Sequence, residues 1–225
     1  MAPTVLNSPP MQPSAEERRK AMWAYYDRRI AHREPGPETV LKYFRGLGVD
    51  ADLGDINSEL LEIEQRLARL PATTFIDVGA GPSGTFTLQL PGLGIALDQS
   101  DGALRQLRSV APRITVARAD ALNLPVRSKA VGRMFVSHLY GLLLPDERAQ
   151  LLTEAARVSD EIVILDSGRP AGALAEEWQA RTLPDGTTYP IYRRHLDVET
   201  VLNEVGGEAL FDGEYFVMVR TPLPG

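Results

Sequence analysis

The spacing of hydrophobic positions changes near Pro71. Before that residue, apolar side chains recur at helical spacing, and Ser14 with Glu17 predicts a capping box at the start of the first helix. The pattern predicts helices over three ranges: Ala15 to about His32, about Glu38 to Leu47, and Ser58 to Leu70. The first thirteen residues contain four prolines, which predicts a disordered or draping tail. We interpret residues 1–70 as this tail followed by a helical lid that caps the substrate.

After Pro71, short apolar runs alternate with amphipathic helices, which is typical of a parallel sheet covered on both faces. The expected strands are Thr73 to Val78, Leu93 to Asp98, Ile114 to Ala117, Gly132 to Ser137 and Glu161 to Asp166. The expected helices are Gly102 to Val110, Asp146 to Val158 and Thr200 to Val205. Glu208 to Phe211 and Tyr215 to Arg220 flank an Asp-Gly pair and predict a closing β-hairpin.

This alternation predicts an α/β domain over residues 71–225, with residues 168–192 inserted as a lid. Within the insertion, Leu183 to Thr187 predicts a tight turn, which favours a β-hairpin over a loose loop. A chain of 225 residues suits one such domain with its N-terminal cap.

Composition limits the kinds of partner that the protein can bind and the cellular compartment in which we expect it. The net charge is −6 and the basic clusters are only two or three residues long, which argues against a nucleic-acid surface. No apolar run approaches the ~20 residues of a spanning helix. The absence of cysteine excludes disulfides and thiolate zinc sites. We expect a cytoplasmic protein, a monomer or a homodimer, whose partner is a small molecule rather than a nucleic acid or a membrane.

A glycine-rich loop directly follows the first expected strand. Gly79-Ala80-Gly81-Pro82-Ser83-Gly84 matches GxGxxG, and Asp98 closes the next strand, where an acid can bind both hydroxyls of a ribose. The amides at the N-terminus of the helix expected after the loop would attract negative groups. The motif fits folds that bind NAD, FAD or S-adenosylmethionine (SAM).

Three features favour SAM over the dinucleotides. Asp77 precedes the first glycine by two residues, and its carboxylate would repel a pyrophosphate. Asp120 and Ala121 follow the third strand, where an acid and a backbone amide can read adenine. The chain also lacks the second half that a flavoprotein of this type needs. Taken singly, Asp77 and Asp120 also fit a structural role as caps of a loop or turn.

The chain resembles the class I SAM-dependent methyltransferases over about residues 75–220. Phe75-Ile-Asp-Val-Gly-Ala-Gly is similar to the first motif of that family, Ala96-Leu-Asp98 to the second and Ala119-Asp-Ala-Leu-Asn-Leu-Pro125 to the third. The resemblance implies a doubly wound, mostly parallel seven-stranded sheet with an antiparallel last strand. Pro82-Ser83 before Gly84 departs from members whose third glycine comes earlier, which puts the amide contacts of this loop in doubt.

The resemblance also implies where cofactor and acceptor lie. The expected cofactor contacts are Asp77, Gly79, Ala80, Gly81, Gly84, Asp98, Gln99, Asp120, Ala121, Ser137 and, at the amino-acid end, Tyr26. The expected acceptor contacts are Trp23, Tyr25, Tyr140 and Tyr189. The alternative for the aromatic residues of the first helix is that they dock it on the sheet.

His138 follows the fourth strand, next to the expected position of the reactive methyl group, and is the candidate general base. Its alternative role is to pack under the adenosine or to cap the strand. Catechol-type enzymes need carboxylates after strands four and five; here Ser137-His138 replaces the first and only Asp166 remains, so no metal is expected.

The predicted activity is methylation of oxygen, nitrogen or carbon on a small molecule, as in bacterial secondary metabolism. Two alternatives stay open: a SAM-fold protein that catalyses another reaction, such as a cyclisation, and a non-catalytic SAM-binding subunit.

Overall fold

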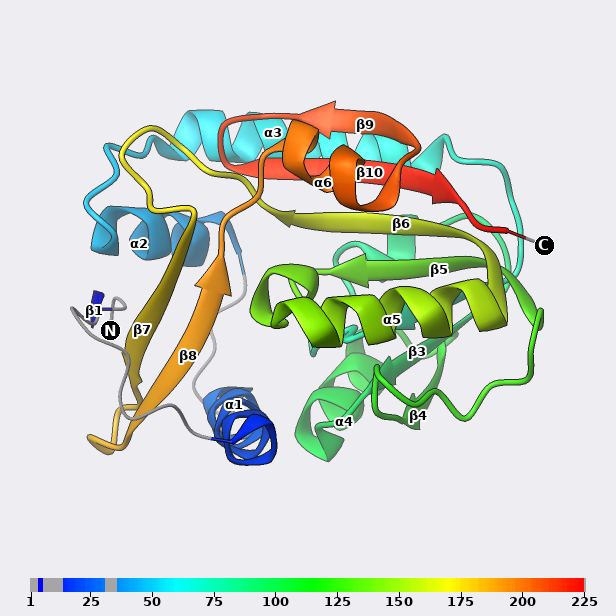
Figure 1. The fold of residues 1–225 in the computed structure, drawn as a ribbon, viewed down its shortest axis with the longest axis horizontal. Helices are drawn as coiled ribbons and strands as arrows, with labels where there is room; N and C mark the ends of the chain where they lie inside the picture. Colours follow the sequence, from blue (N-terminus) through cyan, green and yellow to red (C-terminus); the bar gives the residue numbers. More distant parts are fainter. Residues whose placement is uncertain (1–3, 6–13, 31–35, 225) are drawn as a thin grey trace.

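The computed structural model of the protein describes residues 4–5, 14–30 and 36–224. Its central strands are β2 (Phe75–Val78), β3 (Gly94–Asp98), β4 (Thr115–Arg118), β5 (Val131–Ser137), β6 (Ser159–Ser167), β9 (Glu208–Asp212) and β10 (Phe216–Pro222). They form a seven-stranded sheet in the order β4-β3-β2-β5-β6-β10-β9 (Figure 1). The pairs from β4 to β6 are parallel, whereas β10 runs antiparallel to both β6 and β9. The predicted α/β class with a reversed last strand is therefore confirmed.

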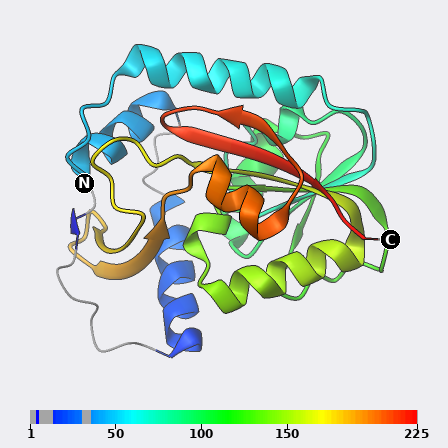
Figure 2. The same cartoon turned by 45° about the horizontal axis from the view of Figure 1, so that its top comes forward.

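Helices cover both faces of this sheet. They are α1 (Ala15–Ile30), α2 (Pro37–Gly46), α3 (Leu53–Ala68), α4 (Asp101–Val110), α5 (Pro145–Val158) and α6 (Val198–Val205). Side chains of α3 and α4 pack on one face, and those of α5 and α6 on the other. Figure 2 shows α3 and α5 on opposite sides of the sheet. The sheet is thus doubly wound, as the alternation of strands and helices predicted.

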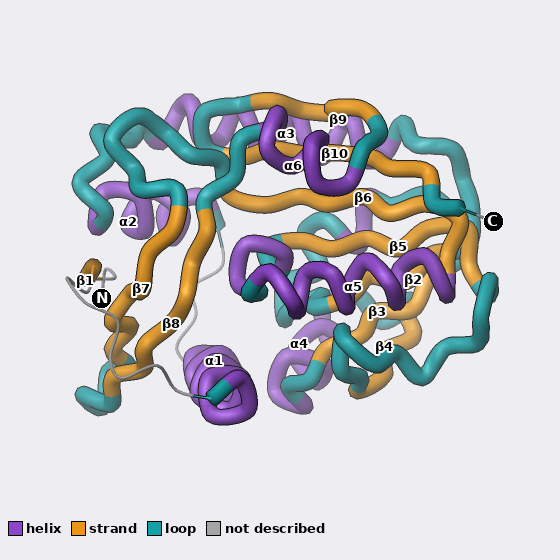
Figure 3. Tube along the Cα trace, in the orientation of Figure 1, coloured by secondary structure: helices purple, strands orange, loops and turns teal. Residues whose placement is uncertain are grey.

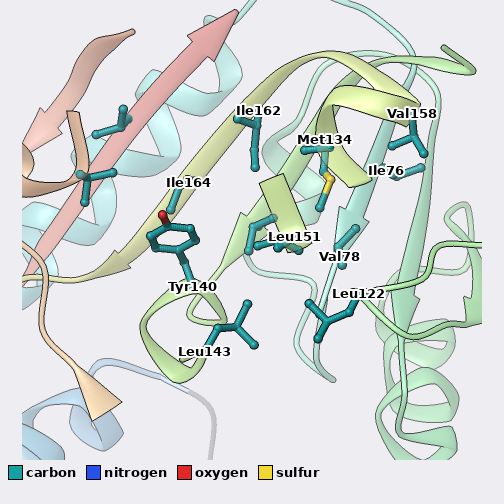
Figure 4. Close-up of a cluster of buried hydrophobic side chains, with 14 of the residues drawn as sticks. Ile76, Val78, Leu122, Met134, Tyr140, Leu143, Leu151, Val158, Ile162 and Ile164 are labelled. Carbon is teal, nitrogen blue, oxygen red and sulfur yellow. The ribbon is translucent and has the colours of Figure 1, made fainter. Parts of the chain in front are cut away.

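The largest core cluster lies between α5 and the sheet (Figure 4). Leu151 of α5 meets Ile76, Met134 and Ile164, which come from three neighbouring strands. Each of these side chains is almost completely buried, and such burial stabilises a fold by about 1.5–3 kcal/mol per side chain. This core fixes the carboxyl ends of β2, β5 and β6 relative to one another.

Within the first 70 residues, α3 begins earlier than predicted and packs with the sheet. The N-terminus of α3 is Leu53 rather than the predicted Ser58, because the Asp52 carboxylate caps it by accepting the amides of Gly54 (2.7 Å) and Asp55 (3.2 Å). Its apolar side chains belong to the cluster that includes Phe135 of β5. Helix α3 is therefore part of the packed core of the sheet domain.

The start of α1 follows the sequence closely. The Glu17 amide donates to Ser14 Oγ (3.2 Å) and the Ser14 amide donates to the Glu17 carboxylate (2.9 Å), so the predicted capping box is confirmed. The predicted end near His32 and most of the Pro-rich tail lie outside the described residues.

A second, three-stranded sheet stands beside the carboxyl ends of the central strands. It consists of β1 (Thr4–Val5), β7 (Glu176–Thr182) and β8 (Thr188–Arg194), all antiparallel, in the order β1-β7-β8. The hairpin within the inserted segment is confirmed, with its turn at Gly186 in the left-handed region (φ 85°). Thr4–Val5, within the segment predicted as a disordered or draping tail, pairs with β7. Figure 3 shows β7 and β8 near α1 and α2, beyond the ends of β5 and β6.

Among the described residues, no helix combines the length and apolar composition needed to cross a membrane.

Candidate active site

One cavity of about 340 Å³ lies where the carboxyl ends of the central strands face α1, α2 and the hairpin. Its wall includes the glycine loop after β2, the ends of β3 and β5, and the segment after β4. Ligand sites in parallel α/β sheets occupy this edge, and the volume falls within the ~300–1,000 Å³ of small-molecule sites. We call it the central cavity.

The glycine loop has the backbone that only glycine adopts easily. Gly79, Gly81 and Gly84 have φ values of 74°, 64° and 63°. The amides of Gly79 and Ala80 donate to the Leu97 carbonyl (2.8 and 3.1 Å), which ties the loop to β3. Gly79, Ala80 and Gly81 line the central cavity; Gly84 does not.

The helix expected after this loop is absent. A single 3₁₀ turn, η1 (Thr87–Gln89), takes its place. Six residues separate Gly84 from Pro91, and proline disfavours a helical residue before it, so too few positions remain for a stable α-helix. The positive end of a helix dipole is therefore not available here, and the ligand contacts of the loop come from its own amides.

Asp77 lies behind the cavity wall rather than on it. Its side chain is 1% exposed and accepts a hydrogen bond from Thr87 Oγ1 (2.5 Å), whereas Oδ1 has no partner among the described residues. Burial raises the pKa of Asp77 to about 7; the bond from Thr87 opposes this rise and the charge of Asp98 adds to it. Asp77 thus lies under the loop rather than on the cavity wall.

Asp98 and Asp120 both line the central cavity. The Asp98 carboxylate accepts the amides of Gly81 (2.9 Å) and Ser100 (2.8 Å), so it holds the glycine loop against the end of β3. Burial raises the pKa of Asp98, an effect that the two amides oppose. The Asp120 carboxylate accepts the Leu122 amide (3.0 Å). Gln99, Ala121 and Ser137 complete this end of the wall.

His138 directly follows β5 in a strained conformation. Its φ is 54°, a value that costs a residue other than glycine about 1–3 kcal/mol and that is often found at functional sites. The imidazole is 37% exposed and lines the central cavity, between the rings of Phe86 and Phe216. Its Nδ1 lies 3.7 Å from Oδ1 of Asp166, an ion-pair distance.

Asp166 and Arg193 form a buried ion pair behind His138. Asp166 also accepts the amides of Gly141 (2.8 Å) and Ser167 (2.7 Å). Burial favours the neutral acid, but the charge of Arg193 and the contact with His138 hold the pKa of Asp166 well below its usual range. The carboxylate next to His138 is therefore permanently charged near neutral pH.

Cations line the wall from other elements than those that carry Asp98 and Asp120. Arg181 and Arg193 come from the hairpin, and Arg19 and Arg29 come from α1. None of the four belongs to the predicted site. Their signal was weak, because arginines in amphipathic segments look the same whether they face solvent or a cavity.

The predicted aromatic residues divide into two groups. Trp23 and Tyr26 line the central cavity. The other three do not: Tyr25 packs against Tyr189, the Tyr189 hydroxyl accepts a bond from Arg28, and the buried Tyr140 donates to Glu204 (2.9 Å). Tyr43 of α2 lines the wall and is absent from the predicted set.

Metal-binding side chains do not gather in the described part of the chain: no group of three or more histidine or acidic side chains there is placed to hold an ion.

Known proteins resemble this chain in its domain and fold. Residues 76–161 match a family model described as a methyltransferase domain. No curated protein sequence matches the chain. Among solved structures, DhpI in complex with SAH (S-adenosylhomocysteine) has a TM-score of 0.67 at 14% identity, over 94% of this chain and 100% of DhpI.

Two archaeal structures are similar over less of the chain. The PH0226 protein of Pyrococcus horikoshii OT3 has a TM-score of 0.58 at 12% identity, over 78% of this chain and 93% of that one. A SAM-dependent methyltransferase of Methanosarcina mazei has a TM-score of 0.54 at 13% identity, over 68% and 94%. At these identities, the likeness establishes a shared fold.

Proposed function

We propose that this chain, which carries a methyltransferase domain and has the fold of the class I SAM-dependent methyltransferases, is a methyltransferase. Its acceptor is a small molecule that binds inside the central cavity. The observation that carries the proposal is the division of one cavity wall into an acidic end at the strand edges and an arginine- and aromatic-rich end under α1, α2 and the hairpin. Two ligands that must meet during a transfer reaction need such a shared, enclosed space.

The acidic end fits an adenosine. Asp98 presents a carboxylate at the end of β3, and Asp120 with Ala121 presents an acid and an amide after β4. Gly79 and Gly81 allow a ligand to approach the backbone, because they bring no Cβ to the wall. SAM, when bound, supplies an electrophilic methyl group on a sulfonium. Asp77 supports this end indirectly, since it contacts Thr87 on the wall.

His138 is proposed to accept the proton that a hydroxyl or amine acceptor loses. Protonation makes its imidazole a cation 3.7 Å from Asp166, and the buried carboxylate stabilises that cation. Arg193 keeps Asp166 ionised and in place. General base catalysis of this kind typically contributes about 10²- to 10⁴-fold in rate. The rest of the acceleration is expected from alignment within the closed cavity.

We propose that the reaction needs no metal, because Ser137-His138 stands where metal-dependent relatives of this fold carry a carboxylate. A net charge of −6 supports a small molecule over a nucleic acid as the acceptor.

The test is methyl transfer from SAM labelled with deuterium in its methyl group to a panel of small hydroxyl and amine compounds, read by mass spectrometry. A product heavier by one labelled methyl group is expected for at least one compound. SAH binding without transfer to any compound would favour the non-catalytic alternative, and a SAM-dependent product without the label would favour another reaction.

The base is tested with His138→Asn, because asparagine tolerates a positive φ and so separates loss of the imidazole from backbone strain. We expect kcat to fall by about 10²-fold or more, with SAH affinity unchanged. If SAH affinity falls and kcat does not, His138 supports the cofactor rather than the chemistry.

A further inference from the structure

We propose that the acceptor carries an oxyanion, a carboxylate or a phosphate-type group, and that Arg181 is the residue that binds it. This inference rests on the proposed function, since it names the class of molecule that shares the central cavity with the cofactor.

The hairpin has an inverted pattern of burial. In β7, the buried positions are Glu177, Gln179 and Arg181, which alternate with more exposed neighbours. The register places Arg193 of β8 opposite Glu177, on the same face. A strand normally buries its apolar face, so a buried polar face indicates that these side chains serve a polar ligand or a polar network.

Arg181 is a buried cation with neutral partners. It is 7% exposed, yet its Nε and Nη2 donate to the Gln179 side-chain carbonyl and its Nη1 donates to the Tyr26 hydroxyl (2.9 Å). No carboxylate of the described residues lies within ion-pair distance of it. The rings of Tyr25 and Tyr43 lie beside the guanidinium but carry no opposite charge. Burying a cation without an anion is unfavourable, so a site that retains one is expected to receive an opposite charge.

The neighbouring acids are engaged elsewhere. Asp166 pairs with Arg193, and Glu177 accepts a bond from Gln179. Burial and the charge of Arg193, with a smaller effect of Arg181, lower the pKa of His195 to about 4, so that this imidazole is neutral at pH 7. Asp166 and Glu177 thus match Arg193 and Arg181 in number, but Glu177 reaches Arg181 only through the neutral Gln179 amide, so no carboxylate of the described residues contacts the Arg181 guanidinium.

The remaining charges of the cavity wall point the same way. Arg19 and Arg29 of α1 also line the cavity, whereas its two acids among the described residues, Asp98 and Asp120, stand at the end of β3 and after β4. An anionic acceptor would therefore be attracted to one end of the cavity and repelled from the other, which orients it.

Arg181 has the donors that an oxyanion needs. A guanidinium has five N–H groups, and three hydrogen bonds are made here, which leaves one N–H on each terminal nitrogen. Gln179 and Tyr26 hold the planar group in place, so little side-chain freedom is lost on binding. Two N–H groups of a fixed guanidinium match the two oxygens of a carboxylate or phosphate.

The test compares charged and neutral probes of the same shape: benzoate, phenylphosphonate and benzamide, titrated by ligand-observed NMR with and without SAH. We expect benzoate or phenylphosphonate to bind about tenfold or more tightly than benzamide. Equal binding of benzamide would overturn the proposal. This comparison uses the wild-type protein, so it does not depend on whether a variant folds.

The residue is tested with Arg181→Met and Arg181→Lys, with Arg28→Met as control, because Arg28 is an exposed cation of α1 outside the wall. Arg181→Met should weaken the better anionic probe by about 10- to 100-fold, Arg181→Lys by less, and Arg28→Met not at all. An unchanged anion affinity in Arg181→Met would overturn the assignment.

A second arm separates the acceptor from the carboxylate of the cofactor. SAH carries that carboxylate and 5′-methylthioadenosine lacks it, so both are titrated into wild type and Arg181→Met by calorimetry. We expect both affinities to stay within about threefold, a difference below 1 kcal/mol. Weakened SAH with unchanged 5′-methylthioadenosine would assign Arg181 to the cofactor instead. Failure of SAH to bind the wild type would refute the proposed function, whereas the comparison of probes without SAH decides the anion site separately.

Discussion

Replacing Asp77 by asparagine removes a buried acid while keeping the size of the side chain. In the wild type, burial raises the pKa of Asp77 from its ordinary 3.8 to about 7. The unfolded chain releases this proton near pH 4, whereas the folded protein keeps it until about pH 7. The contribution of Asp77 to the free energy of unfolding therefore falls as the pH rises from about 4 to about 7, and it stays low above pH 7.

The size of this effect follows from the two pKa values. Their difference, from 3.8 to about 7, corresponds to about 4 kcal/mol at 1.36 kcal/mol per pKa unit. This is the free energy by which the ionised carboxylate destabilises the fold above pH 7. Asparagine carries no charge at any pH, so Asp77→Asn should gain up to about 4 kcal/mol relative to wild type as the pH rises from about 4 to about 8.

The assay is urea unfolding of wild type and Asp77→Asn across this pH range, with the difference between the two proteins as the measured quantity. Taking the difference removes the titration of other groups. Asp50→Asn, at an exposed position, is the control and should show a constant difference. Parallel curves for Asp77→Asn and wild type would refute the reasoning, because they would mean that Asp77 ionises in the fold without penalty.

Other predictions concern the cofactor, the loop and metals. Asp98→Asn should weaken the binding of SAH, measured by calorimetry, by about 10- to 100-fold, because a hydrogen bond to a charged acceptor contributes about 1.5–3 kcal/mol. The control Asp101→Asn, at an exposed position, should leave the affinity unchanged. Equal affinities of the two variants would mean that Asp98 does not bind the ribose. Calorimetry should also show no binding of NAD or FAD. Gly84→Ala should lower the free energy of unfolding in urea by about 1–3 kcal/mol, because the φ of Gly84 is 63° and an added Cβ would lie 2.8 Å from Leu107. The control Thr85→Ala, at an exposed position, should not lower it, and equal stabilities of the two variants would contradict this prediction. Methyl transfer should continue in the presence of EDTA. Loss of activity with EDTA and its return on addition of Mg²⁺ would show that the site holds a metal.

The architecture could be predicted because its signals are local. Short apolar runs and helical spacing lie within each element, and the motif around Gly79, Asp98 and Asp120 sits at three strand ends that a parallel sheet brings together. Helix starts were less certain: Asp52 caps α3 six residues before Ser58, and nothing in the apolar pattern marks that position.

The acceptor end could not be predicted, because long-range packing decides it. Arg181 and Arg193 lie in one short hairpin, and only its docking beside α1 brings their inner face to the cavity. The same reason explains Tyr140: it follows β5, as a site residue would, but its hydroxyl reaches Glu204 of α6 instead.

A crystal structure of the protein with SAH tests the central claim most directly, namely that one cavity holds cofactor and acceptor at opposite ends. The account predicts that the ribose hydroxyls contact Asp98, that the adenine lies beside Asp120 and Ala121, and that the sulfur faces His138. The space bounded by Arg181 and Arg193 should stay open for an acceptor. An adenosine placed at the arginine-rich end, or a SAH molecule that fills both ends, would contradict the account.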